Sequence, residues 1–280
     1  MRLQGKEIQT ILILVLLAAA IPFLPNTTVD YWGLINPRKF LTLIILLSIM
    51  QFGAYIVMRI FGERMGAVFT GLIGGLVSST IVYATLPSIL ATYKNHQNTV
   101  LSLSLFSVIA MLVEISIIIS AASAKLLSML IAPILVMAFF AVSIAIYFVL
   151  YQNRDDKGLI GDFHFSLYSI IKLAIFMAVI LLIVAITKKY LGSHGILPVA
   201  FLTGLFEIHG ISLATGLLVA QKQINLVDAS LAMMLAFSAS FVSKFILLWS
   251  LSPKQFAIKS SVALLVILLP GLITYFVFIY

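Results

Sequence analysis

Apolar runs, several of them longer than the roughly 20 residues that a helix needs to cross a bilayer, dominate this sequence. They lack the strict alternation of apolar and polar residues that is typical of outer-membrane barrels. Of the 280 residues, 62% are hydrophobic and only 9% are charged, which leaves too little polar surface to cover a soluble globule. The sequence therefore predicts an all-α, polytopic membrane protein.

Nine transmembrane helices are predicted, separated by short segments rich in Gly, Pro, Asn and charged residues. Their approximate limits are 8–24, 38–60, 67–90, 99–123, 126–151, 165–188, 196–220, 226–251 and 258–280. No separator is long enough to form a soluble domain, so residues 1–280 are expected to form a single membrane domain. An alternative for the first run is a cleaved signal peptide, because Arg2 and Lys6 precede it and "AAA" ends it. That alternative leaves eight spans.

The basic residues of the predicted loops indicate the orientation. Nine Lys and Arg residues fall on the side of the N-terminus and six on the opposite side. The positive-inside rule then places the N-terminus in the cytoplasm, and we expect a multi-pass protein of a bacterial inner membrane. A formal charge of +8 would suggest nucleic acid in a soluble protein, but here the basic residues lie at span ends. Membrane lipid, and no nucleic acid, is the expected surrounding partner.

An internal repeat is indicated at an offset of 133 residues. "TGLIGGLVSSTIVY", residues 70–83, aligns with "TGLFEIHGISLATG", residues 203–216. Each stretch follows a span that ends in basic residues and a Gly-containing loop, "RIFGERMG" and "KKYLGSHG". The chain is therefore predicted as one lead helix plus two parallel four-helix repeats, 38–151 and 165–280. If the two Gly-rich spans were re-entrant, the parity of each unit would change and the halves would be inverted.

Two predicted spans carry polar residues near the middle of the membrane. In "GLIGGLVSST" the glycines and hydroxyls favour an interrupted helix whose backbone groups meet a substrate; alternatively, Gly71 and Gly75 form a G-xxx-G packing surface. In "TGLFEIHGISL" a carboxylate, Glu207, lies two residues from His209. Such residues point about 200° apart on a helix, so both face one site only if a nearby glycine opens the helix.

Three further titratable groups need partners. Glu114 lies deep in its span with no charge nearby, so it pairs with another helix or remains protonated. Lys172 and Lys244 lie nearer the span ends and either snorkel to the interface or pair with a carboxylate. Gln51 either joins the site or bonds to another helix. The predicted substrate- or ion-binding residues form one central cluster: Gly74, Gly75, Ser78, Ser79, Thr80, Glu114, Glu207, His209, Ser212 and Lys244.

Three stretches, "LPNTTVDYWGLINPRKF", "GAYIVMRIFGERMGAVFTGLIGGLVSST" and "TGLFEIHGISLA", resemble an uncharacterised bacterial integral-membrane family. Members of that family are often found C-terminal to an MgtC/SapB-type domain. The resemblance implies a membrane domain of unknown function, a link to divalent-cation or envelope homeostasis, and an MgtC/SapB-type partner. The family tends to have acidic residues at the positions of Glu207 and His209 and a basic residue near Glu114, so the charges are partly exchanged here.

Two functions follow as hypotheses. One is a transporter or channel for a small ion or polar solute, coupled to protons through Glu207, His209 and Glu114. The other is a non-transporting subunit that binds and regulates a partner, with the polar residues joining helices. We expect no enzyme, because neither an H-E-x-x-H spacing nor a Ser, His and Asp arrangement is present. No cofactor is expected, the metal question is open, and a homodimer is expected.

Overall fold

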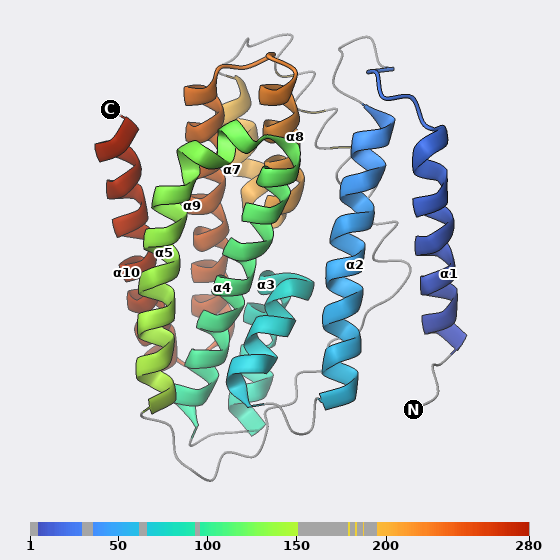
Figure 1. Ribbon diagram of the computed structural model, residues 1–280. Helices are drawn as coiled ribbons and strands as arrows, with labels where there is room; N and C mark the ends of the chain where they lie inside the picture. The colour runs from blue at the N-terminus through green and yellow to red at the C-terminus, as the bar shows by residue number, and fades with distance from the viewer. Residues whose placement is uncertain are drawn as a thin grey trace.

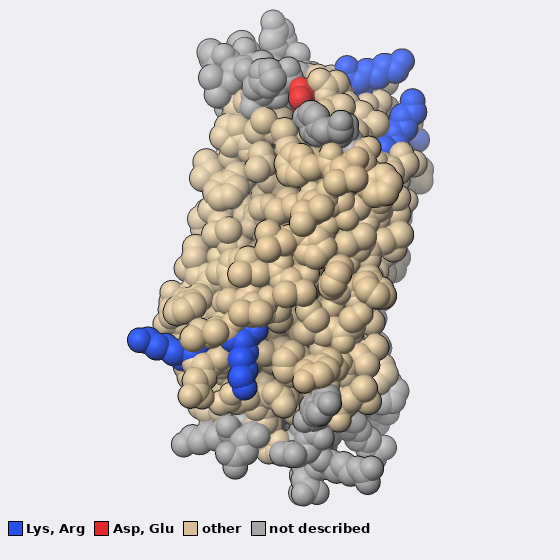
Figure 2. Space-filling view, turned by 90° about the vertical axis from the view of Figure 1, so that its left-hand side faces the viewer, with Lys and Arg blue, Asp and Glu red and all other residues tan. Residues whose placement is uncertain are grey.

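The computed structural model describes residues 5–29, 36–61, 66–92, 96–150 and 195–279, together with positions 179, 183 and 187. Six helices in this part of the chain are long and apolar enough to cross a membrane. Figure 2 shows Lys and Arg side chains near the two ends of the molecule and an uncharged surface between them. The chain is therefore a multi-pass helical membrane protein, as its composition predicts.

The helix limits agree closely with the predicted spans. The bounds are α1 Gly5–Ala20, the 3-10 turn η1 Ile21–Phe23, α2 Pro37–Phe61, α3 Ala67–Thr92, α4 Gln97–Ala122, α5 Ala124–Leu150, α7 Ile196–Phe206, α8 Ile208–Ala220, α9 Leu226–Leu251 and α10 Lys254–Ile279. The span expected at 196–220 is divided into α7 and α8. The span expected at 165–188 lies outside the described residues, so the total of nine stays a prediction.

The first half of α3 runs along α4 in the same direction. Gly71 lies against the backbone of Leu103, and four residues later Gly75 lies against Ser107. A Cβ at either glycine would come within 2.3 to 2.6 Å of α4 backbone atoms, so only glycine allows this approach. These two glycines therefore serve helix packing, in agreement with the G-xxx-G interpretation.

After Ser78 the second half of α3 returns toward its starting end. Ser78 has an extended backbone (φ −175°, ψ 112°) inside the helix, and beyond this break Tyr83 lies beside Ser104 of α4. A straight helix of 26 residues would be about 39 Å long, yet the four residues between Thr92 and Gln97 span at most about 18 Å. Both ends of α3 therefore lie at the starting end of α4, and α3 is a re-entrant hairpin (Figure 1).

α7 and α8 form a second broken element, with its break at Glu207 (φ −156°, ψ 109°). α8 runs beside α4 in the same direction, because His209 meets Glu114 and Gly216 meets Ala122. α9 begins shortly after α8, at the end where α4 finishes. α9 therefore runs antiparallel to α4, which Figure 1 also shows.

The two helix triplets α3–α5 and α7–α10 are related by inversion at an offset of 129 residues. The breaks at Ser78 and Glu207 match at this offset. So do the starts of α4 and α9, at Gln97 and Leu226, and the two glycine contacts. Gly75 packs on Ser107, and Gly204 packs in the same way on Ala236.

For the described helices, the arrangement corresponds to the re-entrant alternative and corrects the predicted parallel repeat. The offset of 133 residues is also replaced, because the breaks, helix starts and glycine contacts coincide at 129. The flanks "RIFGERMG" and "KKYLGSHG" already have the offset of 129. One consequence is that Lys125 at the α4–α5 turn and Lys254 at the start of α10 lie at opposite ends, whereas the loop count placed them together.

Cysteine labelling tests the hairpin directly, because the native chain contains no cysteine. We expect Gly66→Cys and Gln97→Cys, which flank α3, to react with a membrane-impermeant maleimide from the same side of the membrane. Lys222→Cys, in the turn after α8, should react from the opposite side. Labelling of the two α3 flanks from opposite sides would show that α3 crosses the bilayer.

Candidate functional site

Glu207 forms the break between α7 and α8 and caps the helix that follows. Its carboxylate accepts a hydrogen bond from the His209 backbone N–H at 3.0 Å, an N-cap interaction that satisfies a free amide of α8. The extended backbone at Glu207 also turns both side chains to the same place. The opening that the sequence required is therefore at Glu207 itself, between the two glycines considered for it.

His209 bridges two carboxylates with its two ring nitrogens. Nδ1 contacts Glu207 Oε1, and Nε2 lies 3.0 Å from Oε2 of Glu114 on α4. An imidazolium has two N–H donors and can serve both acceptors at once, whereas a neutral ring has only one donor. We call Glu207, His209 and Glu114 the charged bridge. It joins the α7–α8 break to the middle of α4, and it confirms that Glu114 has a partner on another helix.

Exposure changes along the charged bridge. The side chain of Glu207 is 26% exposed, that of His209 is 9% exposed and that of Glu114 is fully buried. Glu114 Oε1 has no hydrogen-bond partner, and the Nε2–Oε2 contact is an ion pair without hydrogen-bond alignment. The bridge thus leads from an accessible carboxylate to a buried one that retains an unused acceptor.

Lys244 lies in the interior, so the snorkelling interpretation is wrong for this residue. It is fully buried on α9, and its ammonium donates to the Ser240 hydroxyl at 2.9 Å and lies 3.5 Å from the Met111 sulfur. It also lies 5.7 Å from the centroid of the Tyr83 ring. Glu207 is close enough to interact with it electrostatically. Lys244 therefore extends the charged bridge toward α9.

Met111, Ser240 and Tyr83, which surround Lys244, were not predicted as site residues. Met111 and Ser240 are separated by the repeat offset of 129 residues and contact each other at 3.5 Å. Equivalent residues that touch mark the pseudo-two-fold axis, so Lys244 lies where the two triplets cross. The correct repeat offset is the sequence signal that could have found them.

The hydroxyl residues of the α3 break occupy the positions equivalent to the charged bridge. Ser78 corresponds to Glu207, and its Oγ accepts a hydrogen bond from the Ile81 N–H at 3.3 Å. Thr80 is half-buried and corresponds to His209. One hairpin therefore has hydroxyls at its break where the other has charges.

Three other predicted site residues have a structural place. Gly74 and Ser79 are buried within the α3 hairpin, and the Ser212 hydroxyl donates to the Ile208 carbonyl of its own helix at 2.7 Å. The side chains of Gln51 and Lys172 lie outside the described part of the chain. Among the described residues, no group of three or more His, Asp or Glu side chains could hold a metal ion.

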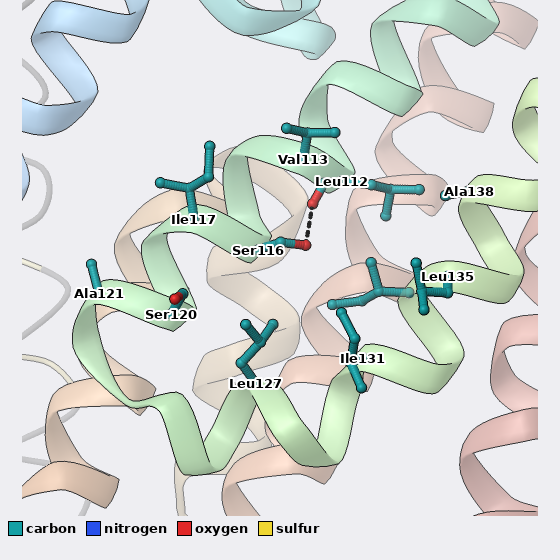
Figure 3. Close-up of a pocket in the computed structure, with 11 residues that line it drawn as sticks. Leu112, Val113, Ser116, Ile117, Ser120, Ala121, Leu127, Ile131, Leu135 and Ala138 are labelled. Atoms are coloured by element: carbon teal, nitrogen blue, oxygen red, sulfur yellow. Dashed lines mark hydrogen bonds between the residues drawn. The ribbon is translucent and has the colours of Figure 1, made fainter.

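A separate apolar pocket of about 550 Å³ lies between α4 and α5 (Figure 3). Val113, Ile117 and Leu135 line it and are substantially exposed. Its serine Ser116 donates to the Leu112 carbonyl at 2.7 Å and so satisfies its own hydroxyl. No charged residue lines this pocket, which separates it from the charged bridge.

A double-mutant cycle tests the bridge. His209→Gln leaves Glu114 buried without a cation and should lower the free energy of unfolding by about 3–5 kcal/mol. Adding Glu114→Gln removes the unpaired charge, so the double variant should be more stable than His209→Gln alone. The measurement is denaturant unfolding in detergent micelles, with Ser116→Ala as the additive control. Additive effects of Glu114→Gln and His209→Gln would contradict the ion pair.

Comparison with known proteins extends over the same helices. Residues 45–252, from within α2 to the end of α9, match the family described as "Domain of unknown function (DUF4010)". This range includes the charged bridge and Lys244. No curated protein and no solved structure matches the chain. Because the match covers more than half of its length, the chain belongs to the DUF4010 family of domains of unknown function.

Proposed function

We propose that the protein is an integral membrane transporter or channel for a small ion or polar solute, coupled to protons through the charged bridge. The observation that carries this proposal is a histidine held between two carboxylates inside the helix bundle. Titratable groups within a membrane are costly and characteristic of proton and ion pathways. Inverted repeats with broken helices provide further support, since transporters often place their sites at such breaks.

The gradient of exposure suggests the proton path. A proton enters at Glu207, the most exposed member, passes through the two nitrogens of His209 and reaches Glu114, whose Oε1 is unused. Protonation of Glu114 removes its charge and weakens its attraction to His209. Because this pair joins α8 to α4, proton arrival loosens the α7–α8 hairpin. Proton binding is thereby coupled to hairpin movement, which can change access to the site.

A second candidate function is a non-transporting membrane subunit. The observation that favours it is tight packing around the same helices: Gly204 lies against the Ala236 backbone and Gly216 against Ala122. In such a subunit the bridge would only hold helices together. Its partner would be an envelope protein, and the family resemblance favours one of the MgtC/SapB type.

Reconstitution into liposomes separates the two functions. With imposed gradients of Na⁺, K⁺ or Cl⁻, we expect the wild-type protein to move protons, read by a trapped pH-sensitive dye. Glu207→Gln and Glu114→Gln should lower this flux by about tenfold or more, as expected when a proton-transfer group is lost. Asp228→Asn, at the exposed start of α9, is the matched control and should retain the flux. Wild-type liposomes without ion-driven proton movement would favour the subunit.

A further inference from the structure

Lys244 is fully buried, and its ammonium has only neutral direct partners among the described residues. These partners are the Ser240 hydroxyl and carbonyl, the Met111 sulfur and the face of Tyr83. Neutral groups do not restore the hydration that a buried ammonium loses, so an apolar residue of similar length would be easier to accommodate. The charge of Lys244 therefore requires an explanation other than packing.

The charges of the site sum to zero when each group has its ordinary charged form. Glu114 and Glu207 supply two negative charges, and His209 and Lys244 supply two positive charges. Glu207 interacts electrostatically with both cations, and His209 with both carboxylates. Without Lys244, the charged bridge alone would have a net charge of −1. An unbalanced charge in the membrane interior is strongly disfavoured, so the lysine makes the buried bridge tolerable.

We propose that Lys244 is the fixed positive charge that keeps the site neutral, so that a transported monovalent ion moves with a balancing proton and without net charge. This inference rests on the proposed transport function. A cation can join a neutral site only if a proton leaves, which is exchange of the cation for a proton. An anion can join only if a proton arrives with it, which is symport. In both cases the loaded site stays neutral.

The geometry assigns the proton to the charged bridge and the fixed charge to Lys244. His209 faces Glu114 from α4 and Glu207 from the α7–α8 break, so a proton can move among three titratable groups in contact. Lys244 is instead held by Ser240 of its own helix and Met111 of α4, where the two triplets cross. Tyr83 is the titratable group that faces it from α3, and Glu207 is the charged group nearby.

Voltage dependence tests the proposal with the full chain in liposomes. Na⁺, K⁺ or Cl⁻ gradients are imposed in separate runs, and the ion ratio at which proton flux stops is measured with and without a membrane potential. The wild-type null ratio should not move. In Lys244→Met the side-chain length is kept and the fixed charge is lost, so one net charge crosses with the load. A potential of about 100 mV should then shift the null ratio by roughly 50-fold.

Two variants control this experiment. Lys259→Met removes an exposed lysine of α10 and should leave the null ratio at the wild-type value. Lys244→Arg keeps the charge and should restore voltage independence. Lys244→Met should fold, because methionine suits the neutral neighbours, and its melting temperature should equal or exceed that of the wild type.

The outcomes distinguish this inference from the proposed function. A wild-type null ratio that moves with the potential overturns the inference and leaves transport intact. A null ratio that is unchanged in Lys244→Met shows that Lys244 does not set the net charge, which also overturns it. Absence of ion-driven proton flux in the wild type refutes the transport function itself, and the inference with it.

Discussion

The ion pair between Glu114 of α4 and His209 of α8 is the contact on which the interior depends. It places a charge of one triplet against a charge of the other, in a region where neither could be left without a partner. For His209 to reach Glu114 and Glu207 together, the helix must break at Glu207. The break leaves free amides at the start of α8, and the Glu207 carboxylate occupies one of them. The break and the ion pair therefore require each other.

Inversion gives the two hairpins equivalent places and different chemistry. The α3 break has the hydroxyls of Ser78 and Thr80, whereas the equivalent positions of the α7–α8 break have Glu207 and His209. Gly75 and Gly204 allow the two hairpins to approach α4 and α9 in the same way. Shared packing with unequal charge is what a coupled device needs, because protonation then acts on one hairpin and leaves its counterpart unchanged. Lys244, near the pseudo-two-fold axis, is the charge that both hairpins approach.

Hydropathy predicted the helix limits within a few residues, because the length of an apolar run reports directly on burial in lipid. It could not predict the fold-back of α3, since one extended residue at Ser78 changes direction without changing hydropathy. The "TGL" identities favoured an offset of 133, while the equivalence of the breaks, which has no sequence identity, lies at 129. Glu114, Glu207 and His209 were predictable because isolated charges in a membrane need partners. The neutral surroundings of Lys244 were not, because they depend on how three helices cross.

The central claim is that the buried bridge exchanges protons with the solution, and infrared difference spectroscopy of the protein in lipid tests it most directly. On a change of bulk pH, the account predicts a carboxyl stretching band that responds to pH, shifts in D₂O and disappears in Glu114→Gln. A spectrum with no such band, or one unaltered in that variant, would show a sealed bridge and contradict the account.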